Sequence, residues 1–419
     1  METQDARRSL RTVCVVGLGY IGLPTAVFFA NAGYHVLGCD TNPYVVEAVK
    51  ESRSPFFEPK FQELLEKSVQ DGSLSVATRP RPSDAFVISV PTPVKDDHDV
   101  DLSYISAATK SIANILEPGN LVVLESTSPP GTTQKVKELV DSVREDLSEE
   151  DKNKILYSHC PERVLPGNIV DEMGTNPRVV GGLTDNATSL AAELYSAITA
   201  SEIFRTNAQT AELTKLAENA YRDVNIAFAN ELSLISDDLG VDVWELVELA
   251  NKHPRVNILN PGPGVGGHCI AVDPWFIVSA SPKSSNLIKT ARQINGSMPR
   301  TVLKRAKLLL EGKIPDRISF LGGSFKANVS DTRESPSVEV IKIFSETYPE
   351  ADLVLVDPHL ENIPDSLRKV KNLRMGGLDA CFDADLTLCL VDHEEFRSLD
   401  PSKGRAIVLD TRGLWKGAK

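Results

Sequence analysis

The tightest constraint on the fold of this chain is a run of three glycines between a β-branched segment and an apolar helical one. Residues 12–16 (TVCVV) are followed by Gly17-Leu18-Gly19-Tyr20-Ile21-Gly22, where a helical pattern begins. Glycine permits a tight turn and a close approach of helix to strand. A strand, a glycine turn and a buried helix also explain why residues 13–30 carry no charge, so we do not expect a membrane span there.

Strand-like and helix-like segments alternate through the first 205 residues. Short Val/Ile-rich runs between amphipathic stretches indicate a parallel sheet covered on both faces, because such strands are buried on both sides. This pattern predicts a doubly wound α/β domain. We expect strands at 12–16, 35–39, 85–90, 121–125 and 154–157, and helices at 43–51 and 104–116.

The rest of the chain divides into a helical centre and a second α/β region. Apolar residues recur at helical spacing over 209–239 and Gly240 supplies a stop, which predicts one long helix. Residues 318–324 (ISFLGGS) echo 13–19 (VCVVGLG) and open a second strand–helix alternation. Its expected elements are strands at 317–321, 352–356, 384–391 and 406–409 and a helix at 338–346. We predict two Rossmann-like doubly wound domains, 1–205 and 301–419, joined by a central helical region, 206–300, that is suited to a subunit interface.

Composition excludes several classes of partner. A formal net charge of -13 over 419 residues disfavours non-specific nucleic-acid binding and adhesion to anionic membranes. The six cysteines form no CxxC pair, so we expect no zinc or other metal site and no thioredoxin-like pair. Free thiols without a signal peptide predict a cytoplasmic protein.

The glycine run has the context of a dinucleotide fingerprint, since it follows a strand and opens a helix. Gly17 would allow the turn, Gly19 the close approach of a pyrophosphate, and Gly22 the packing of helix on strand. Asp40 follows the second predicted strand and can accept hydrogen bonds from an adenosine ribose while repelling a 2′-phosphate. We therefore predict NAD as the cofactor, in contact with the fingerprint residues, Tyr20 and Ile21 included.

Two further loops follow predicted strands. One holds Pro91 and Thr92, and the other, at 126–132, holds Thr127. Ligands in this fold class bind at the carboxyl ends of the strands. Ordinary turn chemistry accounts for the same residues equally well.

A glycine-dense loop at 261–269 (PGPGVGGHC) ends in Cys269, and Asp273 follows four residues later. A cysteine there can act as a nucleophile if its thiolate is stabilised, although a buried thiol beside a turn explains the residues equally well. Lys215 and Asn219 share one face of the predicted long helix at the border of its apolar stripe. A lysine so near a core needs a partner or a function, or else a stem that carries its charge to solvent.

Taken together, these motifs resemble the UDP-glucose/GDP-mannose dehydrogenase family, the UDP-sugar 6-dehydrogenases, over nearly the whole chain. The resemblance is carried by residues 160–167 (CPERVLPG), 253–259 (HPRVNIL) and 261–276 (PGPGVGGHCIAVDPWF). It implies an NAD domain, a central helical dimerisation region and a UDP-binding domain, hence a homodimer or dimer-based oligomer. It also implies two NAD-dependent oxidations at C6 of a UDP-sugar, through a thiohemiacetal and a thioester on a cysteine. The product would be a uronate for surface polysaccharide.

The resemblance assigns a catalytic role to six residues. Cys269 matches the nucleophile, Lys215 would stabilise the reacting oxygen, and Asn219 would hold that oxygen or a water. Asp273 would work with Lys215 and a water as base, and the division of that role stays open. Glu162 would serve thioester hydrolysis or water positioning, and Thr127 would lie near the same water.

Binding residues follow from the same resemblance. Guanidinium groups suit a diphosphate because they present a fork of donors. We expect Arg255 to act from the neighbouring subunit and Arg333 to meet cofactor or substrate near the interface. The implied cofactor contacts beyond the fingerprint are Pro91, Thr92, Thr127 and Arg333, and the implied substrate contacts are Arg163, Val164, Lys215, Asn219, Arg255, Gly266, Lys326 and Arg412.

The chain departs from the glucose-specific members of the family. Those enzymes usually carry a second Glu where this chain has Pro166, and an aromatic residue where it has Arg163. We therefore expect UDP-N-acetyl-D-mannosamine as substrate, with UDP-N-acetylglucosamine and UDP-glucose as alternatives because an epimer is set by pocket shape. A non-catalytic NAD or nucleotide-sugar sensor is the remaining alternative. We expect His268 to be a loop residue and not the base for Cys269.

Overall fold

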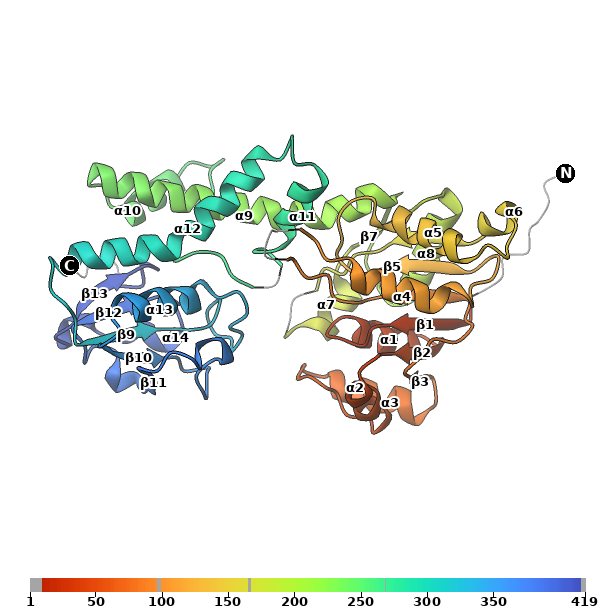
Figure 1. Ribbon diagram of the computed structural model, residues 1–419, viewed down its shortest axis with the longest axis horizontal. Helices are drawn as coiled ribbons and strands as arrows, with labels where there is room; N and C mark the ends of the chain where they lie inside the picture. The colour runs from red at the N-terminus through yellow and green to blue at the C-terminus, as the bar shows by residue number, and fades with distance from the viewer. Residues whose placement is uncertain (1–9, 96–98, 165–166, 268, 416–419) are drawn as a thin grey trace. The chain divides into compact units, whose positions relative to one another are not determined.

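The computed structural model describes residues 10–95, 99–164, 167–267 and 269–415 (Figure 1). Contacts group the chain into two compact units, one of residues 1–217 with 275–280 and the other of residues 218–274 with 281–419. The long helix α9 (Ala208–Leu239) supplies residues to both. The three-part division at 205 and 300 stays a prediction.

The first unit is built on an eight-stranded sheet in the order β3-β2-β1-β4-β5-β6-β7-β8. The order reverses between β1 and β4, the switch point at which doubly wound sheets bind ligands. Its strands are β1 (Thr12–Val16), β2 (His35–Cys39), β3 (Leu74–Ala77), β4 (Ala85–Ile88), β5 (Leu121–Leu124), β6 (Leu156–His159), β7 (Arg178–Gly182) and β8 (Ile203–Asn207). Its helices are α1 (Gly22–Asn31), α2 (Pro43–Lys50), α3 (Phe61–Gln70), α4 (Ser103–Ala113), α5 (Thr132–Val143), α6 (Glu149–Lys152), α7 (Ile169–Thr175) and α8 (Asp185–Ser196).

Alternate residues of the central strands enter two separate cores, as the two-residue period of a strand requires. Val13 and Val87 join residues of α1 and α8 in one core. Cys14, Phe86 and Val122, their neighbours along the strands, join residues of α4 and α5 in the other. Both faces of the sheet are therefore covered by helices, and the predicted doubly wound fold is confirmed.

The sheet is mixed, which the sequence did not predict. β6 and β7 pair antiparallel, whereas every other neighbouring pair in this sheet is parallel. The strands missed from the sequence are β3, β7 and β8 in this sheet and β11 (Leu373–Gly376) in the sheet of the second unit. β8 (Ile203–Asn207) lies at an edge and is mostly exposed, so it lacks the continuous apolar run by which the central strands were recognised.

The second unit holds a five-stranded parallel sheet in the order β11-β10-β9-β12-β13. Helices α12 (Asn286–Leu309) and α13 (Pro336–Thr347) pack on it, with Val302, Ile341 and Phe344 in the shared core. The strands are β9 (Arg317–Leu321), β10 (Asp352–Val356), β11 (Leu373–Gly376), β12 (Leu386–Cys389) and β13 (Ile407–Asp410). The other helices of this unit are α10 (Val243–Ala250) and α14 (Glu394–Arg397), with short 3-10 helices at Asp365–Leu367, Leu378–Ala380 and Pro401–Lys403. Helix α11 (Asp273–Ala280) begins in this unit, but its residues 275–280 belong to the first.

The expected long helix at 209–239 is confirmed as α9, within one residue of its predicted start. The expected strands of both domains are present, except that several end one or two residues earlier than predicted and that β6 begins two residues later. Across the described ranges, no helix combines the length and the apolar character that crossing a membrane requires.

Candidate active site

The fingerprint loop is shaped by two of its three glycines. Gly17 has a φ of 96°, and its N–H donates to the Cys39 carbonyl at 2.8 Å. A Cβ on Gly17 would overlap the Ser89 carbonyl oxygen, and a Cβ on Gly22 would overlap the Gly17 carbonyl oxygen. These two glycines are therefore required by the protein's own packing.

Gly19 differs, because a Cβ there would meet no atom within 4 Å. The protein itself gives no steric reason for a glycine at this position, whereas a ligand that approaches the backbone would. Helix α1 begins three residues later with Ile21 as its N-cap, and no side chain of the described residues caps it. The Leu23 N–H donates to the Gly19 carbonyl at 3.2 Å and Pro24 has no N–H, so an anion at this turn would meet N–H groups that precede Leu23. These residues fit a pyrophosphate.

Asp40 holds the loop from the end of β2. One carboxylate oxygen accepts the Leu18 N–H at 2.9 Å and the other accepts the Asn42 N–H at 2.8 Å. Asp40 is only partly buried, so its carboxylate retains room for further donors. This is the placement expected of a ribose-binding acid.

Tyr20 is tied to a carboxylate that the sequence did not single out. Its hydroxyl donates to Glu58 at 2.6 Å. Glu58 is 5% exposed and also accepts the N–H groups of Gly167 at 3.0 Å and Ile169 at 2.8 Å, at the start of α7. Glu58 thus links the fingerprint loop to the segment that follows Glu162. The spacing of residues along the sequence does not predict this long-range contact.

Hydrogen bonds join the loops after β4 and β5 into one rim at the carboxyl edge of the sheet. The buried Thr92 hydroxyl donates to the Thr127 carbonyl at 2.7 Å. The Ser126 hydroxyl accepts the Val90 N–H and donates to the Val90 carbonyl, each at 2.8 Å. Pro91 is exposed beside them. The structure therefore brings Pro91, Thr92 and Thr127 together at the carboxyl edge of the sheet.

Glu162 is buried and fully engaged. One of its oxygens accepts the Arg163 N–H at 2.7 Å, and the other forms an ion pair with the Arg178 guanidinium at 2.9 Å. Arg178, at the start of β7, is 3% exposed and lies over the Tyr195 ring at 5.2 Å from its centroid. Arg178 was missed from the sequence, because β7 itself was missed. The ion pair with Arg178 fixes the orientation of the Glu162 side chain.

A second buried carboxylate lies close to this pair. Glu125 accepts hydrogen bonds from the Thr25 and Tyr195 hydroxyls at 3.0 Å. Burial raises its pKa to about 7, repulsion from Glu162 adds to the rise, and attraction to Arg178 opposes it. Glu125 therefore titrates near neutral pH.

The Arg163 guanidinium contacts the protein itself and donates to the Pro177 carbonyl at 3.0 Å. Val164 beside it is half-buried. Pro166 and His268 lie outside the described residues, so the interpretations that depend on them are not addressed by the structure.

Cys269 is exposed, whereas the other five cysteines are buried. Burial raises the pKa of both Cys160 and Cys381 to about 12, which leaves those thiols protonated at neutral pH. The Cys269 carbonyl accepts the Asp273 N–H at 2.8 Å, so the cysteine leads directly into α11. The positive end of a helix dipole favours a nearby thiolate.

The structure brings Asn219 and Asp273 together. The Asn219 amide donates to the Asp273 carboxylate at 2.6 Å, and Asp273 is 4% exposed. Lys215 stands one turn earlier on α9 and is half-buried. A buried carboxylate held by an amide is a suitable proton acceptor beside a nucleophile.

The glycine-dense loop packs on the protein itself. Gly264 and Gly267 have φ values of 137° and 84°, as predicted for a glycine run. A Cβ on Gly266 would overlap the Glu334 carbonyl oxygen, and a Cβ on Gly267 would press on the Phe325 ring. The glycines therefore let this loop lie against residues 325–336, which is a packing role that the sequence did not suggest.

A cavity of about 340 Å³ opens at the carboxyl ends of the second sheet. Lys326 lines it after β9, Asp392 after β12 and Arg412 after β13. Arg412 is held by Asp392 through an ion pair of 3.0 Å. The volume lies within the range of small-molecule sites, and the two cations suit an anionic ligand.

Two of the predicted arginines lie apart from this cavity's lining. Arg333 pairs with Asp331, with Nη2 at 2.6 Å from the carboxylate, and its carbonyl accepts the Gly267 N–H. Arg255 is exposed on the segment after α10.

The chain matches three consecutive domains of one family. These are the NAD binding domain over residues 11–199, the central domain over 209–297 and the UDP binding domain over 319–417 of the UDP-glucose/GDP-mannose dehydrogenase family. The chain belongs to this family. The expectation drawn from its motifs is thereby confirmed, and the enzyme is an NAD-dependent dehydrogenase of that family with a domain for UDP.

Individual family members cover nearly the full length. An NDP-N-acetyl-D-galactosaminuronic acid dehydrogenase of Ralstonia nicotianae is 47% identical over 98% of this chain and 97% of its own. A UDP-N-acetyl-D-mannosamine dehydrogenase of Campylobacter jejuni is 45% identical over 93% of this chain and 97% of its own. The solved UDP-D-ManNAc dehydrogenase of Pyrococcus horikoshii superposes with a TM-score of 0.85 at 38% identity, covering 97% of this chain and 96% of its own.

Proposed function

We propose that this family member oxidises C6 of UDP-N-acetyl-D-mannosamine to a carboxylate in two NAD-dependent steps, with Cys269 as the covalent nucleophile. The observation that carries the proposal is the exposed thiol of Cys269, one turn before a buried Asp273 that is held by Asn219. In a family of NAD-dependent sugar-nucleotide dehydrogenases, that arrangement supports thiol-dependent oxidation of an aldehyde.

The bonds and electrons balance as follows. The C6 alcohol loses a hydride and a proton to become an aldehyde. The Cys269 thiolate adds to the aldehyde carbon, and the resulting thiohemiacetal loses a second hydride to become a thioester. Water then cleaves the thioester, releasing the carboxylate and regenerating the thiol. Two NAD molecules, bound in turn, would each supply the acceptor for one hydride.

The side chains have distinct roles in this scheme. Lys215 and Asn219, one turn apart on α9, stabilise the oxygen that develops negative charge. Asp273 accepts the proton. Glu162, held in place by its ion pair with Arg178, orients the water that attacks the thioester, with Thr127 beside the same water.

Binding of the two nucleotides is assigned to separate sets of residues. The fingerprint, Asp40 and the rim at Pro91, Thr92 and Thr127 hold the cofactor, and Asp40 selects NAD over NADP because a carboxylate repels the 2′-phosphate. Lys326 and Arg412 hold the substrate diphosphate in their cavity. The remaining assignments are Arg163, Val164 and Gly266 to the substrate, Arg255 to a neighbouring subunit's substrate and Arg333 to either ligand.

We also propose a homodimer built on α9. Tyr221, Phe228 and Ile235 recur every seven residues and are 71%, 51% and 45% exposed. Two α-helical turns separate successive members, so the three side chains form one apolar stripe. Such a stripe on a single chain marks a protein-interaction surface. The expected compartment is the cytoplasm, where exposed thiols such as Cys269 stay reduced.

A second candidate substrate carries the galacto configuration. It is favoured by the 47% identity to the Ralstonia dehydrogenase named for N-acetyl-D-galactosaminuronic acid. The two sugars differ in the configuration of ring carbons, which pocket shape decides.

The test is the amount of NADH formed per sugar consumed, with UDP-N-acetylmannosamine, UDP-N-acetylgalactosamine, UDP-N-acetylglucosamine and UDP-glucose offered separately. Two NADH from the mannosamine compound alone supports the proposal. Two from another sugar keeps the mechanism and replaces the substrate. One per sugar contradicts the thioester route, and none from any sugar favours a non-catalytic sensor.

A further inference from the structure

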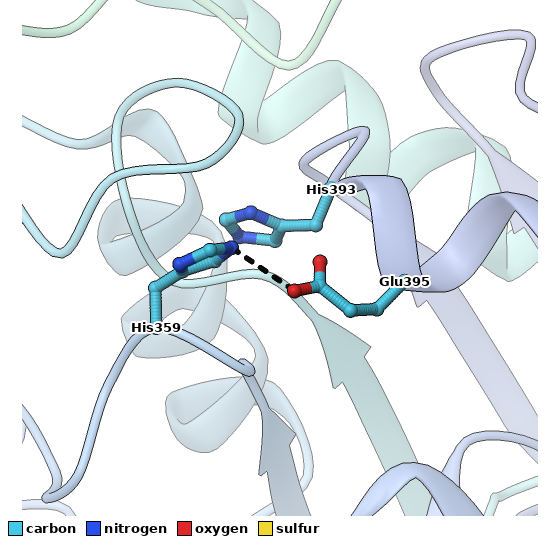
Figure 2. A group of neighbouring side chains, drawn as sticks. All are labelled: His359, His393 and Glu395. Atoms are coloured by element: carbon cyan, nitrogen blue, oxygen red, sulfur yellow. Dashed lines mark ion pairs between the residues drawn. The ribbon is translucent and has the colours of Figure 1, made fainter.

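Among the described residues, His359, His393 and Glu395 bring their nitrogen and oxygen atoms within 4.8 Å of one another (Figure 2). The composition of this cluster suggests a cation site, but the hydrogen bonds of His393 oppose it. Its Nδ1 accepts the Asn328 N–H at 2.9 Å, and its Nε2 lies 3.3 Å from the Asp357 carboxylate. A backbone N–H can only donate, so Nδ1 is unprotonated and Nε2 carries the proton. Neither nitrogen keeps a lone pair for a metal.

The same hydrogen bonds give His393 a different role. Its side chain is fully buried where three segments meet: the end of β10 at Asp357, the loop after β9 at Asn328, and the start of α14. Asn328 has a φ of 59°, a left-handed conformation that needs support in a residue with a side chain. That support comes from two bonds, since the Asn328 side chain also accepts the Glu394 N–H at 3.1 Å.

Asn328 lies in the segment that carries Lys326 into the cavity. Within this segment the Ser324 hydroxyl donates to the Lys326 carbonyl at 3.1 Å, and the Ser335 hydroxyl donates to the Ser324 carbonyl at 3.1 Å. The Phe325 N–H donates to the Asp331 carbonyl at 2.9 Å. Residues 324–335 are therefore a closed loop with few tethers to the sheet, and the Asn328–His393 bond is one of them.

We infer that His393 is a positioning residue for UDP-sugar binding: its Nδ1 accepts the Asn328 N–H and so holds Lys326 in the cavity. A side chain that offers no acceptor at the Nδ1 position leaves the Asn328 N–H without this tether. The inference rests on the proposed function, because that function assigns Lys326 to the substrate.

The charged groups around His393 define the neutral tautomer. Burial acts to raise the pKa of Asp357, but hydrogen bonds from His393 and from the Gly323 N–H outweigh it and hold that pKa below its ordinary value. Asp357 therefore stays ionised and keeps the single proton of His393 on Nε2. The other titratable neighbours are His359, whose ring centroid is 4.8 Å away, and Glu395, which lies 3.5 Å from His359.

The test is calorimetric titration of the full-length protein with UDP-N-acetylmannosamine. His393→Asn places an amide oxygen near the Nδ1 position, so it keeps an acceptor for the Asn328 N–H. It should bind this ligand as tightly as wild type.

His393→Gln supplies the opposite variant, because its amide reaches toward the Nε2 position and leaves the Asn328 N–H unpaired. It should bind the UDP-sugar roughly tenfold more weakly than wild type. His359→Gln is the matched control and should behave as wild type. NAD binding should be unchanged in all three.

The inference is overturned if His393→Gln binds as tightly as wild type, if His393→Asn binds as weakly as His393→Gln, or if His359→Gln loses affinity. Should His393→Gln fold poorly by thermal denaturation, His393→Asn decides alone, and weaker UDP-sugar binding than wild type overturns the inference. Wild type that binds NAD but no UDP-sugar overturns the proposed function together with the inference, whereas tight binding with no effect of His393 overturns the inference only.

Discussion

The two α/β units use the same turn at the head of their sheets. In each, a glycine with φ near 90° follows the first strand, and its N–H donates at 2.8 Å to the last residue of the second: Gly17 to Cys39, and Gly322 to Val356. In each, an aspartate after the second strand accepts a loop N–H, Asp40 from Leu18 at 2.9 Å and Asp357 from Gly323 at 2.7 Å.

The two units differ in the groups that surround this turn and that a ligand would meet. In the first unit α1 begins at Gly22, and Asp40 is partly exposed. In the second unit α13 begins only at Pro336, and Asp357 is buried beneath His393. In the first unit the position beside the aspartate suits a ribose, whereas in the second unit the His393 imidazole fills it. The cavity of the second unit lies instead near the ends of β12 and β13. The same backbone turn thus supports two different ligand sites, because the length of the loop and one side chain determine where a ligand can bind.

The largest expected effect concerns a cysteine in each unit. Cys269→Ala should lower uronate formation by about 10⁴-fold or more while NAD still binds, because no other exposed thiol can form the thioester. Cys160→Ala is the matched control, since the Cys160 thiol is buried and protonated. Steady-state rates measure both variants, and comparable losses in the two would remove the assignment of the nucleophile.

The shared turn predicts equal strain in the two units. Gly17→Ala and Gly322→Ala should each destabilise their unit by about 3 kcal/mol, because a Cβ would overlap Ser89 or Val391 and φ is positive.

Gly19→Ala should change stability by less than about 0.5 kcal/mol yet weaken NAD binding about tenfold. Urea unfolding and NAD titration separate the two effects, and normal NAD binding by Gly19→Ala would argue against a pyrophosphate at this loop.

The buried carboxylates of the two units should shift stability in opposite directions with pH. The pKa of Glu125 is raised to about 7, so its contribution is full below about pH 4.5 and is lost as pH rises through 7, a change of about 3 kcal/mol. The pKa of Asp357 is lowered, so its contribution is present above the unfolded pKa and is lost as pH falls below that value.

Urea unfolding between about pH 5 and pH 8 measures this difference. Glu125→Gln should abolish the fall in stability toward pH 8, and Asp357→Asn should leave that fall in place. A fall toward pH 8 that persists in Glu125→Gln would contradict the assignment of Glu125.

The smallest expected effect is on cofactor choice. Asp40→Asn should weaken NAD binding about tenfold and improve NADP relative to NAD, because the carboxylate that repels the 2′-phosphate is gone. Asp357→Asn should leave the ratio of the two cofactors unchanged. Competition titrations with NAD and NADP give the ratio directly.

The sequence predicted the parts of the molecule that depend on local pattern. The glycine turn, Asp40 and the apolar strands of both sheets were found because period and turn chemistry act over a few residues. The long helix α9 was found for the same reason. The resemblance placed Asn219 and Asp273 in one catalytic set but did not predict their hydrogen bond, which contact between α9 and the start of α11 brings about.

The parts that were missed depend on contacts between distant segments. Arg178 meets Glu162 only because β7 pairs antiparallel with β6, and β7 begins with a charged residue that breaks the apolar signal. Glu58 and His393 each join three segments through hydrogen bonds that no spacing records. The packing role of Gly266 likewise requires knowing that residues 325–336 lie against the loop.

The central claim is that oxidation proceeds through a thioester on Cys269, and one measurement tests it most directly. Glu162→Gln keeps a side chain of the same shape but lacks the carboxylate that orients the attacking water, so the thioester should accumulate during turnover. Acid-quenched protein, digested and weighed by mass spectrometry, should show the UDP-linked acyl group on the peptide that contains Cys269. Uronate formation with no adduct on that peptide, or an adduct on another cysteine, would contradict the account.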